Sequence, residues 1–203
     1  MVDKPRGYFE KVLAADCETS GMSYNHLDPS TGFQSISWGL IVADASTFLP
    51  IEKLYVEIKW DKKSEWKDDA ERVHGLSRDH LEANGLTKEE AAVAIGNLVF
   101  KHWPPTSDFS YQRNVRMLGH NVRSFDYYFM KQLLDEFGIM FSTGNRFIDT
   151  SSIAYAALNC YNSDDAFDLI GVKRDTHNAL ADAQASLDIV RSVRTLYNSF
   201  IGE

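Results

Sequence analysis

The chain has 203 residues, and its 21 lysines and arginines against 29 aspartates and glutamates give a formal net charge of −8. Hydrophobic residues make up 44% of the chain, which is typical of a globular protein, and the length favours one domain over residues 1–203. There is no apolar run of the ~20 residues that span a bilayer, no signal-peptide pattern, and only two cysteines, so we expect no membrane association and a cytoplasmic location. Taken alone, the acidic balance argues against a protein that coats nucleic acid with a basic face.

The pattern of apolar residues in the first third of the chain predicts three strands. Residues 11–16 are almost all apolar, as in a strand buried on both faces. Two further strands are expected over residues 35–42 and 53–59, with a turn near 44–50, and this spacing favours antiparallel neighbours. Residues 60–75 are strongly charged, and we interpret them as a solvated helix face with its flanking loop.

The rest of the chain alternates between short strands and helices. Thr87 and Glu90 form a capping box that opens a helix ending near residue 101. In chain order, the remaining elements are a strand at 115–119, a helix at 124–137, a strand at 147–149, helices at 151–159 and 165–170, and a long helix at 178–200. Three antiparallel strands followed by two strand–helix units predict an α/β fold with a mixed five-stranded sheet.

The first residues with chemical potential stand at the end of the first strand. Side chains alternate along a strand, so Asp16 and Glu18 share one face and Cys17 points to the other. Two buried carboxylates repel each other unless a cation lies between them, so this pair indicates a metal site. The triplet alone is a weak signal. For Cys17 we expect core packing rather than a catalytic thiol.

Two later clusters add acids and histidines. Asp126 falls in the first turn of the helix after the fourth strand, where it can simply complement the helix dipole, although ligands often bind at this edge of an open sheet. Asp182 lies on the C-terminal helix among small apolar residues, and His177 precedes it by five positions. His177 alone has an equally good explanation as a surface residue at the start of the helix.

The order of these motifs resembles the DEDDh, or DnaQ-like, family of 3′–5′ exonucleases. Asp-x-Glu comes first, then His-Asn-x-x-x-Phe-Asp, then His-x-x-x-x-Asp. Val73-His74-Gly75-Leu76 and Asp149-Thr150 resemble two shorter family motifs, so the likeness covers nearly the whole chain. It implies a ribonuclease-H-like three-layer fold, with the mixed five-stranded sheet flanked by helices.

The resemblance also implies roles for individual residues. Asp16, Glu18, Asp126 and Asp182 would hold two Mg²⁺ ions, which Mn²⁺ can replace. His177 would act as the general base, and 5′-mononucleotides would leave from the 3′ end. The implied substrate-binding residues are Thr19, Ser20, Gly21, Met22, His74, Asn121 and Phe125. For Met22 and Phe125 core packing is the alternative, and His74 and Asn121 can instead brace their own loops.

The expected partner is the 3′ end of a nucleic acid, with DNA favoured over RNA, and replication or repair proteins are possible associates. Two alternatives remain open: RNA trimming on the same fold, and a non-catalytic nucleic-acid-binding or polymerase-docking module. The four implied metal ligands account for half of the net charge of −8. The acidic composition therefore argues only against a broad basic binding face, and it fits an enzyme that holds a strand end through metals and stacking.

Overall fold

A mixed five-stranded sheet lies at the centre of the protein, in the strand order β3-β2-β1-β4-β5. The computed structural model describes residues 10–22, 32–104, 114–172 and 177–201. The strands are β1 (Lys11–Thr19), β2 (Ser35–Asp44), β3 (Pro50–Glu57), β4 (Met117–Gly119) and β5 (Ile148–Asp149). β1 pairs antiparallel with β2, and β2 pairs antiparallel with β3, whereas β1, β4 and β5 run parallel. The predicted mixed sheet is confirmed.

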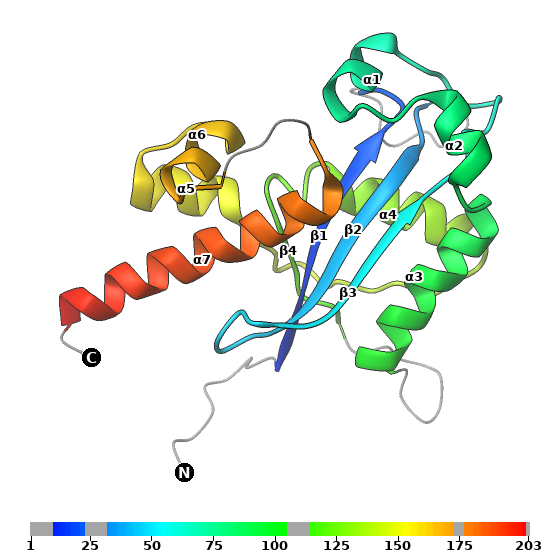
Figure 1. Ribbon diagram of the computed structural model, residues 1–203. Coiled ribbons are helices and arrows are strands. Elements are labelled where there is room, and N and C mark those ends of the chain that lie inside the picture. The colour runs from blue at the N-terminus through cyan, green and yellow to red at the C-terminus, as the bar shows by residue number, and fades with distance from the viewer. Residues whose placement is uncertain (1–9, 23–31, 105–113, 173–176, 202–203) are drawn as a thin grey trace.

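Helices cover both faces of this sheet (Figure 1). Helices α3 and α4 pack on one face, and α7 crosses the other beside α5 and α6. The short helices α1 and α2 lie near the end of the sheet at which β1 finishes. The helices are α1 (Asp68–His74), α2 (Arg78–Asn84), α3 (Lys88–His102), α4 (Asp126–Glu136), α5 (Thr150–Leu158), α6 (Ser163–Leu169) and α7 (Ala179–Ile201).

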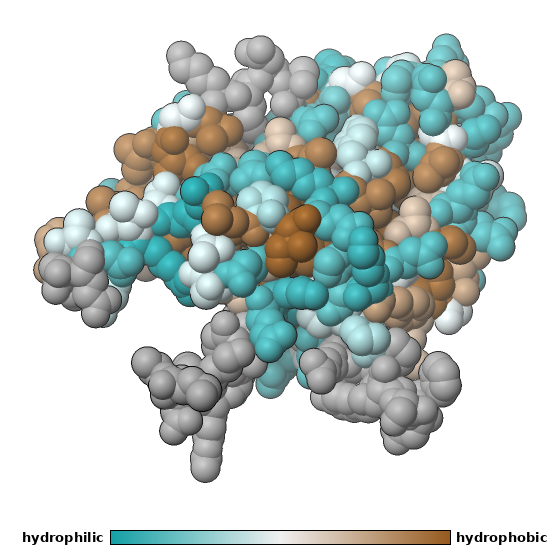
Figure 2. All heavy atoms as spheres, turned by 60° about the horizontal axis from the view of Figure 1, so that its bottom comes forward, coloured by the Kyte–Doolittle hydropathy of each residue, from teal (hydrophilic) through white to brown (hydrophobic). Residues whose placement is uncertain are grey.

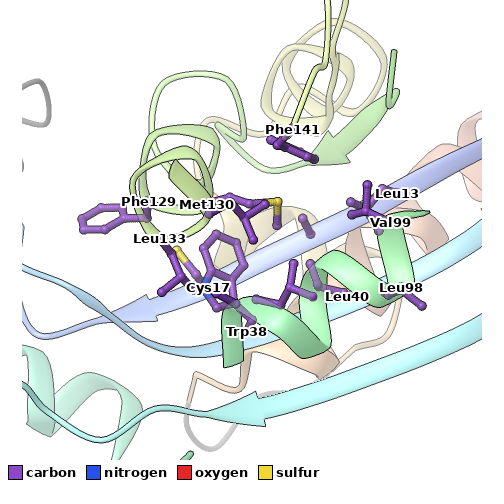
Figure 3. Packing of buried hydrophobic residues seen from close by; sticks show 14 of the residues in the cluster. Leu13, Cys17, Trp38, Leu40, Leu98, Val99, Phe129, Met130, Leu133 and Phe141 are labelled. Carbon is purple, nitrogen blue, oxygen red and sulfur yellow. The ribbon is translucent and has the colours of Figure 1, made fainter. Parts of the chain in front are cut away.

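Alternation along β1 divides the core between the two faces. Leu13 and Cys17 pack with Trp38 against α3 and α4, as Figure 3 shows. Val12 and Ala14 face the opposite way, into the cluster under α7. Cys17 is 5% exposed, so its predicted place in the core is confirmed. The even-numbered residues that follow Ala14 along the strand therefore belong to the α7 side of the sheet.

The start of α7 lies directly against the backbone of β2. A Cβ atom added to Gly39 would stand 2.2 Å from the backbone of Ala179, so only glycine permits this approach. Gly39 is paired with Asp16 in the β1–β2 register. The contact therefore brings the first turn of α7 to the end of β1 where the carboxylates lie.

The predicted elements differ from the structure at their edges, and helix α2 was not predicted. β3 begins at Pro50, three residues before the predicted start, and β4 omits residues 115 and 116. The backbone N–H of Val115 donates to the carbonyl of Ser142 instead, which is not part of a strand. The capping box of Thr87 and Glu90 is confirmed at the start of α3. Most of the two long loops at 22–33 and 102–114 falls outside the described residues.

The surface mixes hydrophilic and hydrophobic residues. Figure 2 shows it from the end of the molecule away from α1, where hydrophobic patches are separated by hydrophilic residues. None of the helices in the described part of the chain is long and apolar enough to cross a bilayer.

Candidate active site

A cleft of about 660 Å³ opens beside the carboxyl end of β1. Its walls come from the end of β1, from α1, from the start of α4 and from the segment that precedes α7. The lining residues are Asp16, Cys17, Glu18, Thr19, Gly21, Met22, Lys67, Asp69, Ala70, Val73, His74, His120, Phe125, Asp126 and His177. Nine of the predicted site residues are thus brought to one cavity from segments far apart in the chain.

The end of β1 supplies two carboxylates and a tight turn. Glu18 is 8% exposed and Asp16 is half-buried, both on the α7 side of the sheet. The Thr19 hydroxyl donates to the carbonyl of Gly21 over 2.8 Å. Ser20 is fully buried, and its hydroxyl accepts from the Gln34 backbone N–H, so its side chain stabilises the turn and does not line the cleft.

Asp126 is the first residue of α4, and its carboxylate reaches the backbone of β1. Oδ1 accepts a 2.9 Å hydrogen bond from the N–H of Cys17. Burial raises the pKa of Asp126 to about 7, although the hydrogen bonds from Cys17 act in the opposite direction. Burial, followed by the charge of Asp126, also raises the pKa of the Cys17 thiol well above its ordinary value. A buried thiol with a raised pKa is a poor nucleophile, which supports a packing role.

Asp182 lies in the first turn of α7, is 3% exposed and is not among the residues that line the cleft. Asn178 caps this turn, because its Oδ1 accepts from the N–H of Ala181. Nδ1 of His177 lies 3.7 Å from Oδ2 of Asp182. Ligand atoms of Glu18, His177 and Asp182 all lie within 4.8 Å of one another. Asp16 and Asp126 line the same cleft and are not members of this group.

Helix α1 forms part of the cleft wall. His74, 5% exposed, ends this helix, and its Nδ1 accepts from the N–H of Leu76. Because a backbone N–H only donates, the neutral ring carries its proton on Nε2. Burial, and then the charge of His177, lower the pKa of His74 to about 4, so the ring is neutral at pH 7. The backbone N–H of His177 donates to the carbonyl of Val73, which ties the start of α7 to α1.

Lys67 is a cleft residue that the sequence did not single out. Its N–H donates to the carbonyl of Ser20 over 2.8 Å, and its exposed side chain places Nζ 3.4 Å from the carbonyl of Met22. Lys67 belongs to the charged run at 60–75, and charge alone does not say which side of a helix meets a cleft. The spacing of Lys67, Ala70 and His74 on one face of α1 was the only available signal.

The remaining predicted residues take different places. Met22 is 71% exposed at the cleft, which excludes core packing for its side chain. Phe125 lines the cleft and also packs against the α3–α4 cluster, with its ring centroid 5.1 Å from that of Phe129. Asn121 adopts a left-handed φ of 57°, and its N–H donates to Oδ1 of Asp149, so it shapes a turn outside the cleft lining.

Solved structures of exonuclease I share this fold. E. coli exonuclease I in complex with a dT13 oligonucleotide matches with a TM-score of 0.73 and 18% identity, over 96% of this chain and 43% of that chain. The zinc-bound form of an E. coli exonuclease I–ssDNA complex matches with a TM-score of 0.69 and 18% identity, over 92% of this chain and 41% of that chain. A moderately thermophilic exonuclease I from Methylocaldum szegediense matches with a TM-score of 0.67 and 19% identity, over 95% of this chain and 43% of that chain.

The chain spans less than half the length of these proteins, and at such identities the likeness concerns the fold. The likeness confirms, at the level of the fold, the resemblance expected from the motifs. No protein-family model matches the chain, and no curated protein matches it in sequence.

Proposed function

We propose that the protein is a metal-dependent 3′–5′ exonuclease that releases 5′-mononucleotides from single-stranded DNA. The observation that carries this proposal is the convergence of three separate motifs on one cleft. The motif residues Asp16, Glu18, Asp126 and His177 line the cleft, and Asp182 lies beside His177. Acidic groups and a histidine in one cavity are the groups that metal-assisted phosphodiester hydrolysis requires.

The metal ligands in this proposal are Asp16, Glu18, Asp126 and Asp182, with two Mg²⁺ ions that Mn²⁺ can replace. The donors fit, because they offer only carboxylate oxygens, the ligands that these hard cations prefer. Burial raises the pKa of the Asp126 carboxyl, and a cation beside it would favour the charged carboxylate. When bound, the ions would neutralise charge on the attacking and leaving oxygens of a phosphoryl displacement.

His177 is the general base of the proposed reaction. Its side chain is 39% exposed at the cleft, so water and substrate reach it, whereas Asp182 is held rigidly on α7. The imidazole would take the proton of the attacking water. The bond from the His177 N–H to the carbonyl of Val73 limits how far the base moves from the cleft.

The substrate would lie between α1 and the end of β1. Met22 and Phe125 would stack on terminal bases, at ~1–3 kcal/mol per base and without reading sequence. Thr19, Gly21 and His74 line the space for the last nucleotide, and Lys67 is positioned to meet a phosphate. For Ser20 and Asn121 we propose an indirect role, since each holds a turn beside the cleft.

Single-stranded DNA is the favoured substrate because two of the structural neighbours are complexes with a dT13 oligonucleotide and with ssDNA. The test compares DNA and RNA oligonucleotides of one sequence, single- and double-stranded, labelled at the 5′ end, with Mg²⁺ or Mn²⁺. We expect a ladder that shortens from the 3′ end, fastest for single-stranded DNA, and slow cleavage when the 3′ end carries a phosphate. Faster loss of RNA would favour the RNA-trimming alternative, and binding without cleavage would favour the non-catalytic module.

A further inference from the structure

Two tryptophans between β3 and α1 extend the wall of the cleft away from the carboxylates. The ring centroids of Trp60 and Trp66 are 5.8 Å apart, in an edge-to-face arrangement. The ring of Trp66 also meets that of His74, with the centroids 6.2 Å apart. Because His74 lines the cleft, the three rings form a continuous series that leads from the cleft to Trp60.

Arg78, the first residue of α2, lies over both tryptophans. Its Cζ atom is 5.5 Å from the ring centroid of Trp60 and 5.6 Å from that of Trp66. Arg78 is exposed, whereas both tryptophans are half-buried. An exposed guanidinium is flat, so it can stack on a nucleobase while its N–H groups meet a phosphate. We call Trp60, Trp66 and Arg78 the tryptophan platform.

The positive charge of the platform is not neutralised within the described part of the chain. Arg78 contacts the two rings there, and Nζ of Lys67, at the cleft, contacts the carbonyl of Met22. No carboxylate among the described residues forms an ion pair with either cation. Asp69, the acid of α1 that lines the cleft, is paired with Arg72. Two cations along the ring series are therefore available to phosphates.

The indole N–H groups of the two tryptophans differ in their partners. Nε1 of Trp60 donates to the carbonyl of Ser64 over 3.2 Å, which holds this ring on its own loop. Nε1 of Trp66 is buried and has no acceptor among the residues that the structure describes. A buried donor without an acceptor costs stability, so an acceptor oxygen from a bound molecule would stabilise the platform.

We propose that the tryptophan platform binds a single strand of nucleic acid a few nucleotides before its 3′ end, outside the catalytic cleft. Aromatic rings beside cations form the usual binding surface for single strands, because bases stack on the rings and phosphates meet the cations. The ring contacts of 6.2 and 5.8 Å correspond to roughly three or four stacked nucleotides, at about 3.4 Å each. The substrate class rests on the proposed function, whereas contact with the strand does not require cleavage.

A second exposed arginine on an aromatic ring provides the matched control. Cζ of Arg194 lies 4.4 Å from the ring centroid of Phe48, and Arg194 is outside the cleft lining. Arg194→Gln therefore removes the same kind of contact as Arg78→Gln, at a place where no strand is expected. Circular dichroism should show both variants folded, because both arginines are exposed.

The binding test follows tryptophan fluorescence while an oligothymidine of about 12 nucleotides is added in the presence of a chelator. The other two of the four tryptophans, Trp38 and Trp103, are buried, so quenching by stacked bases reports on Trp60 and Trp66. We expect Arg78→Gln to raise the Kd about fivefold or more, and Arg194→Gln to change it less than about twofold. An unchanged Kd in Arg78→Gln, or binding of the oligothymidine without quenching, would overturn the platform.

The kinetic test compares the same oligothymidine with a thymidine dinucleotide, which is too short to reach the platform when its 3′ end is in the cleft. With Mg²⁺, Arg78→Gln should raise KM about fivefold for the long strand and less than about twofold for the dinucleotide. An equal rise for both substrates would show that Arg78 only supports the cleft. If the wild type cleaves neither substrate but quenching still depends on Arg78, the exonuclease function fails and the platform stands.

Discussion

The backbone N–H of Cys17 donates a 2.9 Å hydrogen bond to Oδ1 of Asp126, which lies 109 positions later in the chain. Cys17 stands between the two carboxylates of β1, so the same short stretch presents two acids through side chains and holds a third through its backbone. The bond requires no particular side chain at position 17. It joins β1 to the first turn of α4 at the proposed metal site.

Cys17→Ala should therefore keep the proposed nuclease activity within about twofold, because the N–H that holds Asp126 is retained. Loss of the buried thiol should lower the free energy of unfolding by roughly 1–2 kcal/mol, through the small cavity that it leaves. Initial rates of oligonucleotide digestion and urea unfolding measure the two effects. Loss of activity in a folded Cys17→Ala protein would instead indicate a chemical role for the thiol.

Asp126→Asn should stabilise the metal-free protein at neutral pH. The folded pKa of about 7 exceeds the ordinary 3.8, so the stability contributed by Asp126 is present below about pH 3.8 and is lost as pH rises toward 7. The asparagine oxygen can still accept from Cys17 and stays uncharged. We expect a gain in free energy of unfolding that grows across this window, to at most roughly 4 kcal/mol.

Thermal or urea unfolding between pH 4 and pH 8, with a chelator present, measures this difference. Asp79→Asn, in the first turn of α2, is the control for a carboxylate outside the cleft lining. A stability gain that is constant across the pH range would show that Asp126 does not titrate in this window.

Gly39→Ala should destabilise the protein by several kcal/mol, because the added methyl group would stand 2.2 Å from the backbone of Ala179. Neither backbone can yield without moving α7, so Asp182 should also be displaced and the proposed activity lost. Gly96→Ala is the matched control, since its Cβ would stand 3.0 Å from a flexible side-chain atom of Ile139. Urea unfolding of both variants makes the comparison, and equal stabilities would contradict the close docking of α7.

Lys67→Gln should weaken substrate binding more than catalysis. A lost charge-assisted contact of about 1 kcal/mol corresponds to a roughly fivefold higher KM for single-stranded DNA, with kcat nearly unchanged. The slope of log KM against log salt concentration should fall by about 0.7, the value for one phosphate of a single strand. Lys62→Gln, an exposed change outside the cleft lining, should leave KM and the salt slope unchanged. A salt slope that does not respond to Lys67→Gln would remove Lys67 from the substrate path.

Local periodicity explains what could be predicted from the sequence. The alternation along residues 11–18 placed Asp16 and Glu18 on one face and Cys17 on the other, because strand geometry is set by adjacent residues. The capping box of α3 is equally local. The motif order predicted the fold, which solved structures of exonuclease I share.

Contacts between distant segments explain what could not be predicted. The docking of α7 on Gly39 and the bond from His177 to Val73 join residues far apart in sequence, and neither leaves a local pattern. The seven-residue helix α2 is too short to show a clear apolar period. The places of Ser20 and Lys67 depend on the tertiary structure around the cleft. The Ser20 side chain is buried in a turn, whereas the Lys67 side chain lines the cleft.

The most direct measurement of the central claim is the release of 5′-mononucleotides from a 5′-labelled single-stranded DNA with a free 3′-OH. Wild-type protein and the single variants Asp16→Asn and His177→Ala are compared with Mg²⁺ and with a chelator, after circular dichroism has shown that all are folded. We predict processing from the 3′ end by the wild type only with metal, and a loss of about 10²-fold or more in each variant. Equal release of 5′-mononucleotides by the wild type and both folded variants would contradict the assignment of this cleft as the active site.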